Sequence, residues 1–379
     1  MRSFWLLTGF EYKKLFQRKI VWITLAVMIA ACILLPCISY MATGYTIDGE
    51  PVNGYDLKKK HVAQDKEASG TRLDGKTLKN MEESPSDIPG GLFNMVYYIT
   101  GGWEVDGLKE QELYQIRENN IEANWESARL SKGEKKYMAE QEEKIEKPLT
   151  YEYSDGYQEA GTQMVFVGLL QTLLIAICIP SIFAEEHIRK TDQLNLCTNM
   201  GKKTLYLAKI AVGISFSLAA TVILALAITI PTFLINGLEG FDAPIQSFAP
   251  LESWAMTAGV RLLIMMAMGL LAAILHSAAG MLMSEKARGN VAPMAVMVGF
   301  MLVSLFVTVP DQYRALAQAW DLVPGNVLSA TGPFGVRLFQ IFGRYLAAWQ
   351  VVPFVYLAVA AACIVLGGRL YKNYQVSGR

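Results

Sequence analysis

The chain has 379 residues, of which 53% are hydrophobic and only 18% are charged. A soluble domain usually carries about a quarter charged residues, so the composition argues against an ordinary soluble protein. The formal net charge of zero hides a strong segregation. Residues 42–163 hold 24 of the 34 acidic residues but only 15 of the 34 Lys and Arg, a net charge of −9, and the rest therefore carries +9. An acidic, polar block is thus inserted into an apolar chain whose basic residues lie elsewhere.

Residues 1–19 have an amphipathic pattern at helical spacing. Glu11, Lys14 and Arg18 share one helical face. The opposite face carries Phe4, Trp5, Thr8, Tyr12, Leu15 and Phe16. The pattern is typical of a helix that lies in the membrane interface. The alternative is a plain cytoplasmic extension of the first membrane span.

Six apolar runs follow, and each is long enough to cross a membrane as a helix. A helix rises 1.5 Å per residue, so about 20 apolar residues span a hydrocarbon core of ~30 Å. The runs are residues 20–41, 164–183, 210–234, 262–283, 291–309 and 346–366. A large soluble core does not explain them, because buried soluble helices are shorter and interrupted by polar residues. The sequence therefore predicts an all-α membrane protein with six transmembrane helices.

The acidic block divides the chain into three predicted parts. Residues 1–41 form the interfacial helix and the first span. Residues 42–163 form a mostly helical extracytoplasmic domain. Residues 164–379 form the other five spans, with a cytoplasmic loop at 184–209.

Inside the acidic block, residues 108–130 and 132–147 are rich in Glu, Lys, Gln and Ala, which favour helix. Residues 56–68 are a third helix candidate, and residues 45–52 are typical of a hairpin with an Asp-Gly turn. Few apolar residues lie between Asp56 and Ser84, so this part is predicted to be thinly packed.

Residues 70–77 match the phosphate-binding pattern G-x-x-x-x-G-K-[ST] to the letter. The motif works only when a buried strand precedes it and a helix follows, so that backbone N–H groups converge on phosphate. The preceding residues 61–69 are polar and contain no apolar strand. A nucleotide site is therefore not expected, and an ordinary loop that starts a helix is.

The basic residues set the predicted orientation, because Lys and Arg concentrate in cytoplasmic loops. They cluster before the first run, after the second, after the fourth and in the C-terminal tail, whereas the loops after the third and fifth runs are acidic. Six spans with both termini in the cytoplasm satisfy every loop and place residues 42–163 outside.

No catalytic or metal-binding arrangement is visible in the sequence. The three histidines, His61, His187 and His276, are far apart, and the five cysteines lack metal-ligand spacing. Glu185 and Glu186 are adjacent, so on a helix they point about 100° apart and do not converge as a catalytic pair. The chain is therefore not expected to be an enzyme.

Charges are nearly absent from the predicted spans. Lys209 and Arg261 lie near span edges, where their long side chains can snorkel to the interface. His276 fits either a helix–helix hydrogen bond or a proton relay. A proton- or ion-coupled carrier would normally show buried acids. The predicted spans contain none, so the energy for any transport must come from elsewhere.

Small residues recur every fourth position in two runs. They are Gly269, Ala273 and Ser277 in the fourth run, and Ala358 and Ala362 in the sixth. Such spacing favours close helix contacts, either within one chain or between two copies.

Residues 183–209 join the second and third runs and are the most specific feature of the sequence. They predict a short charged helix at 185–196, a turn at 199–201, and then the third span. A polar helix at the membrane surface between two spans suits docking on a soluble partner. A plain solvated loop is the alternative.

This stretch resembles the loop of type-2 ATP-binding-cassette (ABC) exporter permeases, which reads E-E-x-x-x-x-T-D-x-L-L-x-T-x-x-G-K-x-x-L-x-x-A-K. The matching residues here are Glu185, Glu186, Thr191, Asp192, Leu194, Leu196, Thr198, Gly201, Lys202, Leu205, Ala208 and Lys209, with Asn195 in place of the second Leu of the family pair. Residues 149–157 are also similar to an aromatic element that precedes the second span in bacterial permeases with a large external domain.

The resemblance implies a bacterial cell-membrane permease subunit whose loop seats in a groove of a separate ATPase. The expected coupling residues are Glu185, Glu186, Arg189, Lys190, Thr191, Asp192, Leu194, Leu196, Gly201 and Lys202. The expected partners are the ABC ATPase, a second permease copy or a related permease, and membrane lipid, with no nucleic acid. No cofactor is expected on this chain, since ATP and Mg²⁺ would bind the ATPase. The expected cargo is a peptide, a lipid-linked molecule or another amphipathic substrate.

Two other functions remain open. The chain could belong to a non-transporting sensor or immunity complex, whose external domain binds an antimicrobial peptide or a cell-wall precursor. It could also be an autonomous carrier or membrane enzyme, which would act without an ATPase partner. The sequence does not identify the substrate, and it does not separate a homodimer from a heterodimer of permeases.

Overall fold

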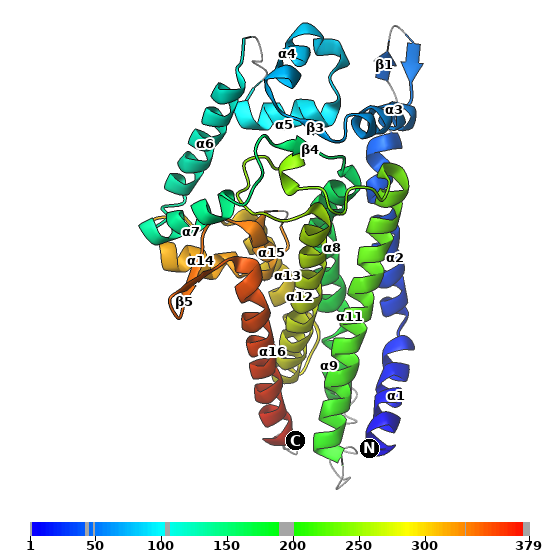
Figure 1. Cartoon of the computed structure of the whole chain (residues 1–379). Helices are drawn as coiled ribbons and strands as arrows, with labels where there is room; N and C mark the ends of the chain where they lie inside the picture. The colour runs from blue at the N-terminus through cyan, green and yellow to red at the C-terminus, as the bar shows by residue number, and fades with distance from the viewer. Residues whose placement is uncertain are drawn as a thin grey trace.

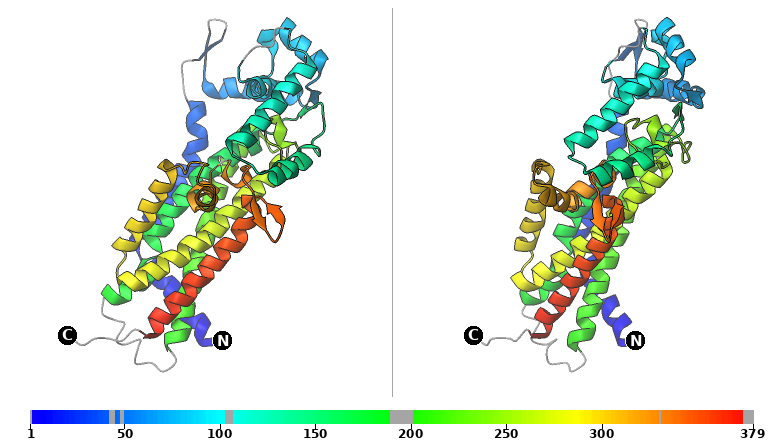
Figure 2. Two further views of the ribbon diagram at one scale, coloured as in Figure 1. Left: turned by 90° about the vertical axis from the view of Figure 1, so that its left-hand side faces the viewer. Right: turned by 60° about the vertical axis from the view of Figure 1, so that its left-hand side comes forward.

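The computed structural model describes residues 2–41, 45–47, 50–102, 107–188, 201–329 and 331–373. The structure is mostly helical: long helices run side by side as a bundle, and shorter helices cap one end of it (Figures 1 and 2). The N-terminus and the end of the last helix lie at the opposite end (Figure 1). We call the end with the termini the terminal end and the capped end the distal end.

Long apolar helices dominate the bundle and indicate a multi-pass membrane protein. Within the described part of the chain, five helical stretches are long and apolar enough to cross a membrane, namely Lys19–Ile38, Asp155–Ile188, Lys202–Asn236, Ala258–Ala287 and Ala348–Asn373. They belong to α2 (Lys19–Met41), α8 (Asp155–Cys178) with α9 (Ser181–Ile188), α11 (Gly201–Asn236), α12 (Ala258–Ala287) and α16 (Ala348–Asn373). Five of the six predicted runs thus lie on long helices.

The predicted fifth span is shorter than expected. It forms α13 (Val291–Phe306), whose 16 residues reach about 24 Å, less than the ~30 Å of a hydrocarbon core. The helix ends because Val307 adopts an extended conformation. The apolar run 291–309 is therefore longer than the helix that it forms. α13 still reverses the chain, so that α12 and α16 both run toward the terminal end (Figure 1).

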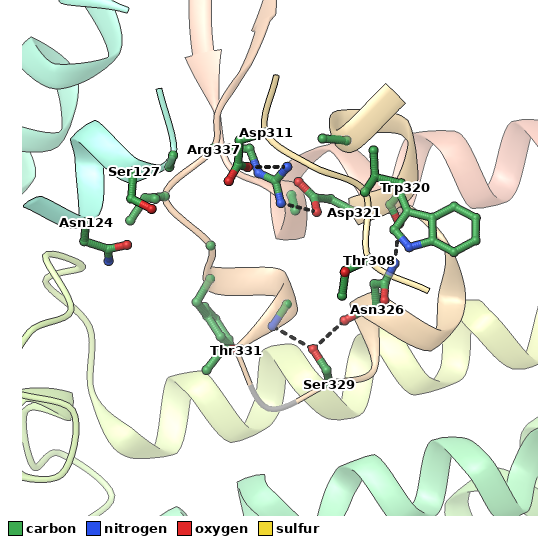
Figure 3. Close-up of a pocket in the computed structure, with 18 of the residues that line it drawn as sticks. Asn124, Ser127, Thr308, Asp311, Trp320, Asp321, Asn326, Ser329, Thr331 and Arg337 are labelled. Atoms are coloured by element: carbon green, nitrogen blue, oxygen red, sulfur yellow. Dashed lines mark hydrogen bonds and ion pairs between the residues drawn. The ribbon is translucent and has the colours of Figure 1, made fainter. Parts of the chain in front are cut away.

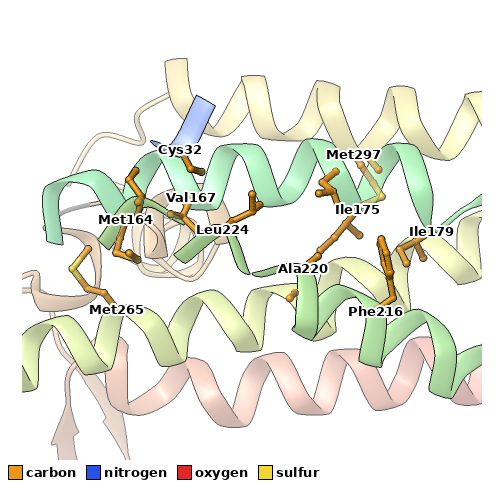
Figure 4. Packing of buried hydrophobic residues seen from close by; sticks show 14 of the residues in the cluster. Cys32, Met164, Val167, Ile175, Ile179, Phe216, Ala220, Leu224, Met265 and Met297 are labelled. Atoms are coloured by element: carbon orange, nitrogen blue, oxygen red, sulfur yellow. The ribbon is translucent and has the colours of Figure 1, made fainter. Parts of the chain in front are cut away.

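α8 occupies the centre of the bundle. Its apolar window is 67% buried, against 22% for α2 and 28% for α16, and it packs against α2, α11, α12 and α13. Figure 4 shows Met164, Val167 and Ile175 of α8 among side chains from the neighbouring helices, such as Leu224 and Met265. The outer faces of α2 and α16 instead expose large apolar side chains, as a lipid-facing surface would.

The two sets of small residues have different surroundings. The Gly269 carbonyl of α12 accepts a hydrogen bond from Gln171 Nε2 of α8 at 3.0 Å, and Ala273 and Ser277 are fully buried. The α12 set therefore makes contacts within the chain. Ala358 and Ala362 of α16 are exposed on the outer face.

His276 of α12 approaches α8. Its Nδ1 lies 3.4 Å from Thr172 Oγ1, on the wall of a cavity of about 220 Å³ that α13 also lines. The contact fits the predicted helix–helix hydrogen bond.

Short helices and paired strands form the distal end. The helices are α3 (Gly54–Glu67), α4 (Gly75–Glu83), η1 (Pro85–Asp87), α5 (Gly90–Thr100), α6 (Glu110–Ser127) and α7 (Lys132–Glu142). β3 (Thr71–Arg72) pairs antiparallel with β4 (Thr150–Tyr151). β1 (Tyr45–Ile47) pairs antiparallel with β2 (Glu50–Val52), so the predicted hairpin is confirmed, although its turn at 48–49 lies outside the described residues.

The distal helices have an apolar core of their own. Leu73 and Leu78 pack with Met95, Ile99 and Leu113, and all are at most 1% exposed. The prediction of thin packing between residues 56 and 84 is therefore wrong. The few apolar residues of that stretch suffice because α5 and α6, from further along the chain, supply the rest of the core.

The remaining short elements connect the long helices at the distal end (Figure 1). They are η2 (Ile245–Ser247) before α12, and α14 (Arg314–Asp321), α15 (Pro324–Val327), η3 (Gly332–Phe334), β5 (Phe339–Ile341) and β6 (Arg344–Leu346) before α16. β5 and β6 pair as an antiparallel hairpin.

Candidate functional site

Four charged side chains meet at the terminal end, where α1 (Arg2–Phe16), α9 and α11 come together. Lys209 of α11 contacts Glu11 of α1 (Nζ–Oε2 3.3 Å) and Glu186 of α9 (Nζ–Oε1 3.0 Å). Lys14 of α1 contacts the same two carboxylates, at 2.6 Å from Glu11 and 3.1 Å from Glu186. Two acids and two bases thus alternate around a ring. We call these four residues the charge cluster.

The charge cluster is largely buried. Lys209 is fully enclosed, Glu11 is 4% exposed and Glu186 is 7% exposed, whereas the Lys14 side chain is half exposed. The Lys209 ammonium also donates to the Ile182 carbonyl at 2.7 Å. Its three N–H donors therefore have three acceptors, the two carboxylates and this carbonyl. A buried ion pair needs such complete partnering to offset the cost of removing charge from water.

Lys209 and Glu11 correct two predictions. Lys209 was expected to snorkel to the interface, but it points inward because two carboxylates compensate its charge. Glu11 was expected on the polar face of α1, opposite Thr8 and Leu15. It is instead buried together with Thr8 and Leu15 of the predicted apolar face, while Trp5 of that predicted face is 70% exposed. Pairing with Lys209 explains why Glu11 is buried.

Two acids are buried near helix ends of the bundle, just outside the apolar runs, which themselves contain none. Glu186 lies two residues before the end of the stretch Asp155–Ile188, and Glu285 of α12 is 6% exposed. Glu285 lies 3.2 Å from Nε2 of His187 in α9. The helices extend beyond the apolar runs, so residues assigned to loops belong to the last turns of buried helices.

The carboxylates around Lys14 keep its ammonium charged. Burial lowers the pKa of Lys14, but the hydrogen bonds and charges of Glu11 and Glu186 outweigh burial and raise it above its ordinary value. Nearby, Arg18 Nε lies 3.7 Å from Glu185 Oε2. These side chains line a cavity of about 580 Å³ between α1 and α9.

The structure places only part of the predicted coupling set. Glu185 and Glu186 lie on α9 next to α1, and Gly201 and Lys202 begin α11. Arg189, Lys190, Thr191, Asp192, Leu194 and Leu196 lie outside the described residues. The helix predicted at 185–196 is described only as far as Ile188. Within the described residues, Glu186 thus lies two residues before the end of α9, and Lys209 lies eight residues after the start of α11.

Sequence reasoning missed the role of Glu11 and Lys14. A signal for Glu11 was present: it is the lone acid among the first 47 residues. Lys209, a lone cation at the edge of an apolar run, offered it a partner. The pairing of Glu11 with Lys209 depends on the packing of α1 against α11, which the sequence does not show.

The phosphate-loop pattern at residues 70–77 has no phosphate-binding geometry. The N-terminal amides of α4 already have acceptors: Thr77 N donates to Asp74 Oδ1, and Gly75 N donates to Glu110 Oε2, both at 2.9 Å. Two carboxylates at this point would repel a phosphate. The Thr77 N–H lowers the pKa of Asp74, which keeps the cap charged. The predicted helix-starting loop is confirmed.

A second polar region lines a cavity of about 540 Å³ at the distal end, between α6 and the segment that contains α14 (Figure 3). Arg337 lies between two acids, 2.9 Å from Asp321 and 3.1 Å from Asp311. Burial raises the pKa of Asp321 to about 6, although the Arg337 charge opposes the rise. The charge of Asp321 therefore changes in a mildly acidic medium.

Mild acid is expected to stabilise the segment around α14. The Asp321 pKa is higher in the folded protein than the ordinary value near 3.9, so its contribution is fully present below about pH 4 and is lost as pH rises through about 6. The difference is up to about 3 kcal/mol, at about 1.4 kcal/mol per pKa unit. Hydrogen exchange of α14, corrected for intrinsic rates, should show protection falling between pH 4 and pH 6.

Asp321→Asn should remove this dependence on pH, while Asp242→Asn, an exposed acid at the same end, should keep it. Protection of α14 that rises over the same interval would contradict the assignment.

Arg261 is the other cation predicted to snorkel. It is 8% exposed and forms an ion pair with Glu252, and its guanidinium carbon lies 4.5 Å from the centre of the Phe334 ring. The snorkelling prediction is therefore wrong for Arg261 too, because an acid and an aromatic ring enclose the charge.

Comparison of the chain with models of protein families, with curated proteins and with solved structures finds no match in any of the three. The geometry of the site and the pattern of the sequence therefore carry the functional argument.

Proposed function

We propose that this chain is the transmembrane permease subunit of an ATP-driven exporter and that its ATPase is a separate chain. The charge cluster is the observation that carries the proposal. It ties together α9 and α11, which flank the segment 189–200, and it adds α1 as a third element. The sequence of that segment resembles the coupling stretch of type-2 ABC exporter permeases.

The cluster suits mechanical coupling because it bonds α9 to α11, the two helices that precede and follow residues 189–200 in the chain. A push on residues 189–200 reaches α9 through Glu186 and α11 through Lys209, which are bonded to each other. α9 continues the line of α8, the central helix of the bundle. Movement at the membrane surface would therefore reach the centre of the bundle.

The proposal implies a set of partners. ATP and Mg²⁺ bind the ATPase, and this chain carries no cofactor. A second copy or a related permease completes the translocation unit, and lipid covers the exposed apolar faces of α2 and α16. In this arrangement α13 is a short sixth crossing, which places both termini in the cytoplasm and the distal end outside. The cargo is a peptide, a lipid-linked molecule or another amphipathic substrate.

Affinity purification of the full chain from its native membrane tests the proposal. The expected result is that an ATPase chain co-purifies and hydrolyses ATP. Recovery of this chain alone would contradict an ATP-driven complex and favour the autonomous carrier or enzyme.

A variant sharpens the test. Glu186→Lys places a third cation beside Lys14 and Lys209, so the ATPase should be lost from the complex or its ATP hydrolysis should no longer respond to the permease. Lys372→Glu reverses an exposed charge on α16 at the same end and serves as the control. Equal ATPase recovery and activity in the two variants would count against coupling through the cluster.

The alternative, a non-transporting sensor complex, would contain the same ATPase but would not move a substrate across the membrane. One observation favours the sensor complex: the distal helices have their own apolar core, as a separate binding module would. Purified complex in sealed vesicles separates the two readings. ATP-dependent accumulation of an amphipathic fluorescent peptide supports export, and ATP hydrolysis without accumulation supports sensing.

A further inference from the structure

A cavity of about 350 Å³ lies where the distal helices join the bundle. Its walls come from α3, α5, β4 and the first turns of α8, and Ser247 and Phe248 of the α11–α12 connection complete it. This volume suits a side-chain-sized ligand. The elements that form its walls, such as α3 and α5, lie at the opposite end of the molecule from α1 and α9, which carry the charge cluster (Figure 1).

The walls carry more negative than positive charge. Asp65, Asp155 and Glu159 line the cavity together with Lys58 and His61. Lys58 is committed to Asp155, with Nζ and Oδ2 2.9 Å apart. Among the described residues, Asp65 and Glu159 have no ion-pair partner. Two carboxylates therefore lack a cation in direct contact, and the charge of Lys58 acts on both from further away.

Asp65 is the more deeply buried of the two. It is 5% exposed, and the Gly91 amide donates to its Oδ1 at 2.9 Å. Burial raises the pKa of Asp65, although this amide lowers it. A cation bound in the cavity would stabilise the ionised form of this carboxylate, because a nearby opposite charge offsets the cost of burial.

Tyr151 is a second and independent indication of a ligand. Its side chain is 3% exposed and lines the same cavity, yet its hydroxyl has no hydrogen-bond partner among the described residues. A Cβ at position 91 would overlap this hydroxyl, so Gly91 leaves the room that it occupies. A buried hydroxyl without a partner is costly, and an N–H donor in the cavity would satisfy it.

We propose that this cavity binds a primary ammonium group, such as that of an alkyl amine or a lysine side chain. Asp65 and Glu159 supply the opposite charge, and the Tyr151 hydroxyl accepts one of the three ammonium N–H bonds. An anion is disfavoured by the free carboxylates. A metal ion is disfavoured because the described residues contain no group of three or more His, Cys, Asp and Glu placed to hold one.

The test uses the purified full chain in detergent micelles and does not require an ATPase. Cadaverine, an unbranched diamine with the spacing of a lysine side chain, is titrated by calorimetry. The control ligand is 1,5-pentanediol, which has the same length but no charge. The expected result is saturable binding of cadaverine that weakens with added salt, and no binding of the diol.

Two variants localise the binding. Asp65→Asn keeps an acceptor for the Gly91 amide but removes the charge, and should weaken cadaverine binding by about tenfold or more. Tyr151→Phe keeps the ring and removes the hydroxyl, and should weaken binding by roughly fivefold without loss of folding. Glu67→Gln changes an exposed acid of α3 and should leave the affinity unchanged.

Absence of saturable cadaverine binding, or equal affinity for the diol, would overturn the proposal. Equal cadaverine affinity in the wild type and Tyr151→Phe would overturn it even if Asp65→Asn failed to fold. Because binding is measured on the isolated chain, a negative result here is distinct from a failure to recover an ATPase.

Discussion

Replacing Lys209 by methionine is expected to be the most damaging single change at the terminal end. Methionine has a similar shape but no charge, so Glu11 and Glu186 would stay buried without their shared cation. Removal of one partner from a buried ion pair costs about 3–5 kcal/mol. The half-exposed Lys14 offsets part of that cost. The melting temperature in detergent should fall, and the amides of α1 should exchange faster.

The neighbouring Lys203 provides the control. It is exposed on the same helix, and Lys203→Met should change stability by less than about 0.5 kcal/mol. The neutral combination Glu11→Gln, Glu186→Gln and Lys209→Met should recover much of the loss, because no unpaired charge remains inside. If Lys209→Met behaves like Lys203→Met, the cluster does not hold α1 to the bundle.

Replacing Arg117 by methionine is expected to loosen the distal helices from the bundle. Arg117 of α6 is 1% exposed. Its Nε donates to the Pro250 carbonyl at 2.7 Å, and its two terminal nitrogens bond to the Glu142 carboxylate of α7. One guanidinium thus joins α6, α7 and the connection that precedes α12.

The expected cost of Arg117→Met is about 3 kcal/mol, at the low end for a broken buried pair because Lys147 remains 3.5 Å from Glu142. Hydrogen exchange should accelerate in α6 and α7 and stay slow in α12. Arg72→Met, at an exposed position of the same distal end, is the control.

Arg117→Lys gives an independent check. It keeps the charge but loses the planar fork that bonds Pro250 and Glu142 together, so an intermediate loss is expected. Exchange in α6 and α7 that is identical in the wild type and both Arg117 variants would contradict the anchoring role.

Long-range pairing explains most of the errors made from the sequence. The apolar runs at 20–41, 164–183, 210–234, 262–283 and 346–366 correspond to long helices, since composition over some 20 residues is a strong local signal. Lys209 and Arg261 were misplaced because the partners that enclose them, Glu11 and Glu252, lie outside the apolar runs. A prediction made one run at a time treats each charge as exposed.

The candidate site was predictable only in part. The loop pattern drew attention to Glu185 and Glu186, and the structure places both against α1. The ring that Glu186 forms with Lys14 and Lys209 spans residues far apart in the chain, and no periodicity connects them. The cavity lined by Asp65, Tyr151 and Glu159 was likewise not predictable from the sequence, because these residues come from three different elements.

The sequence by itself determined that the protein is helical and crosses a membrane, because helix formation and hydrophobicity are properties of neighbouring residues. It also determined that residues 42–163 differ in character from the rest. The tertiary structure alone decided that α13 is short, that the distal helices share a core, and which charges are buried. These outcomes depend on side chains that meet across the fold, and the stability of a buried charge depends on the partner it finds there.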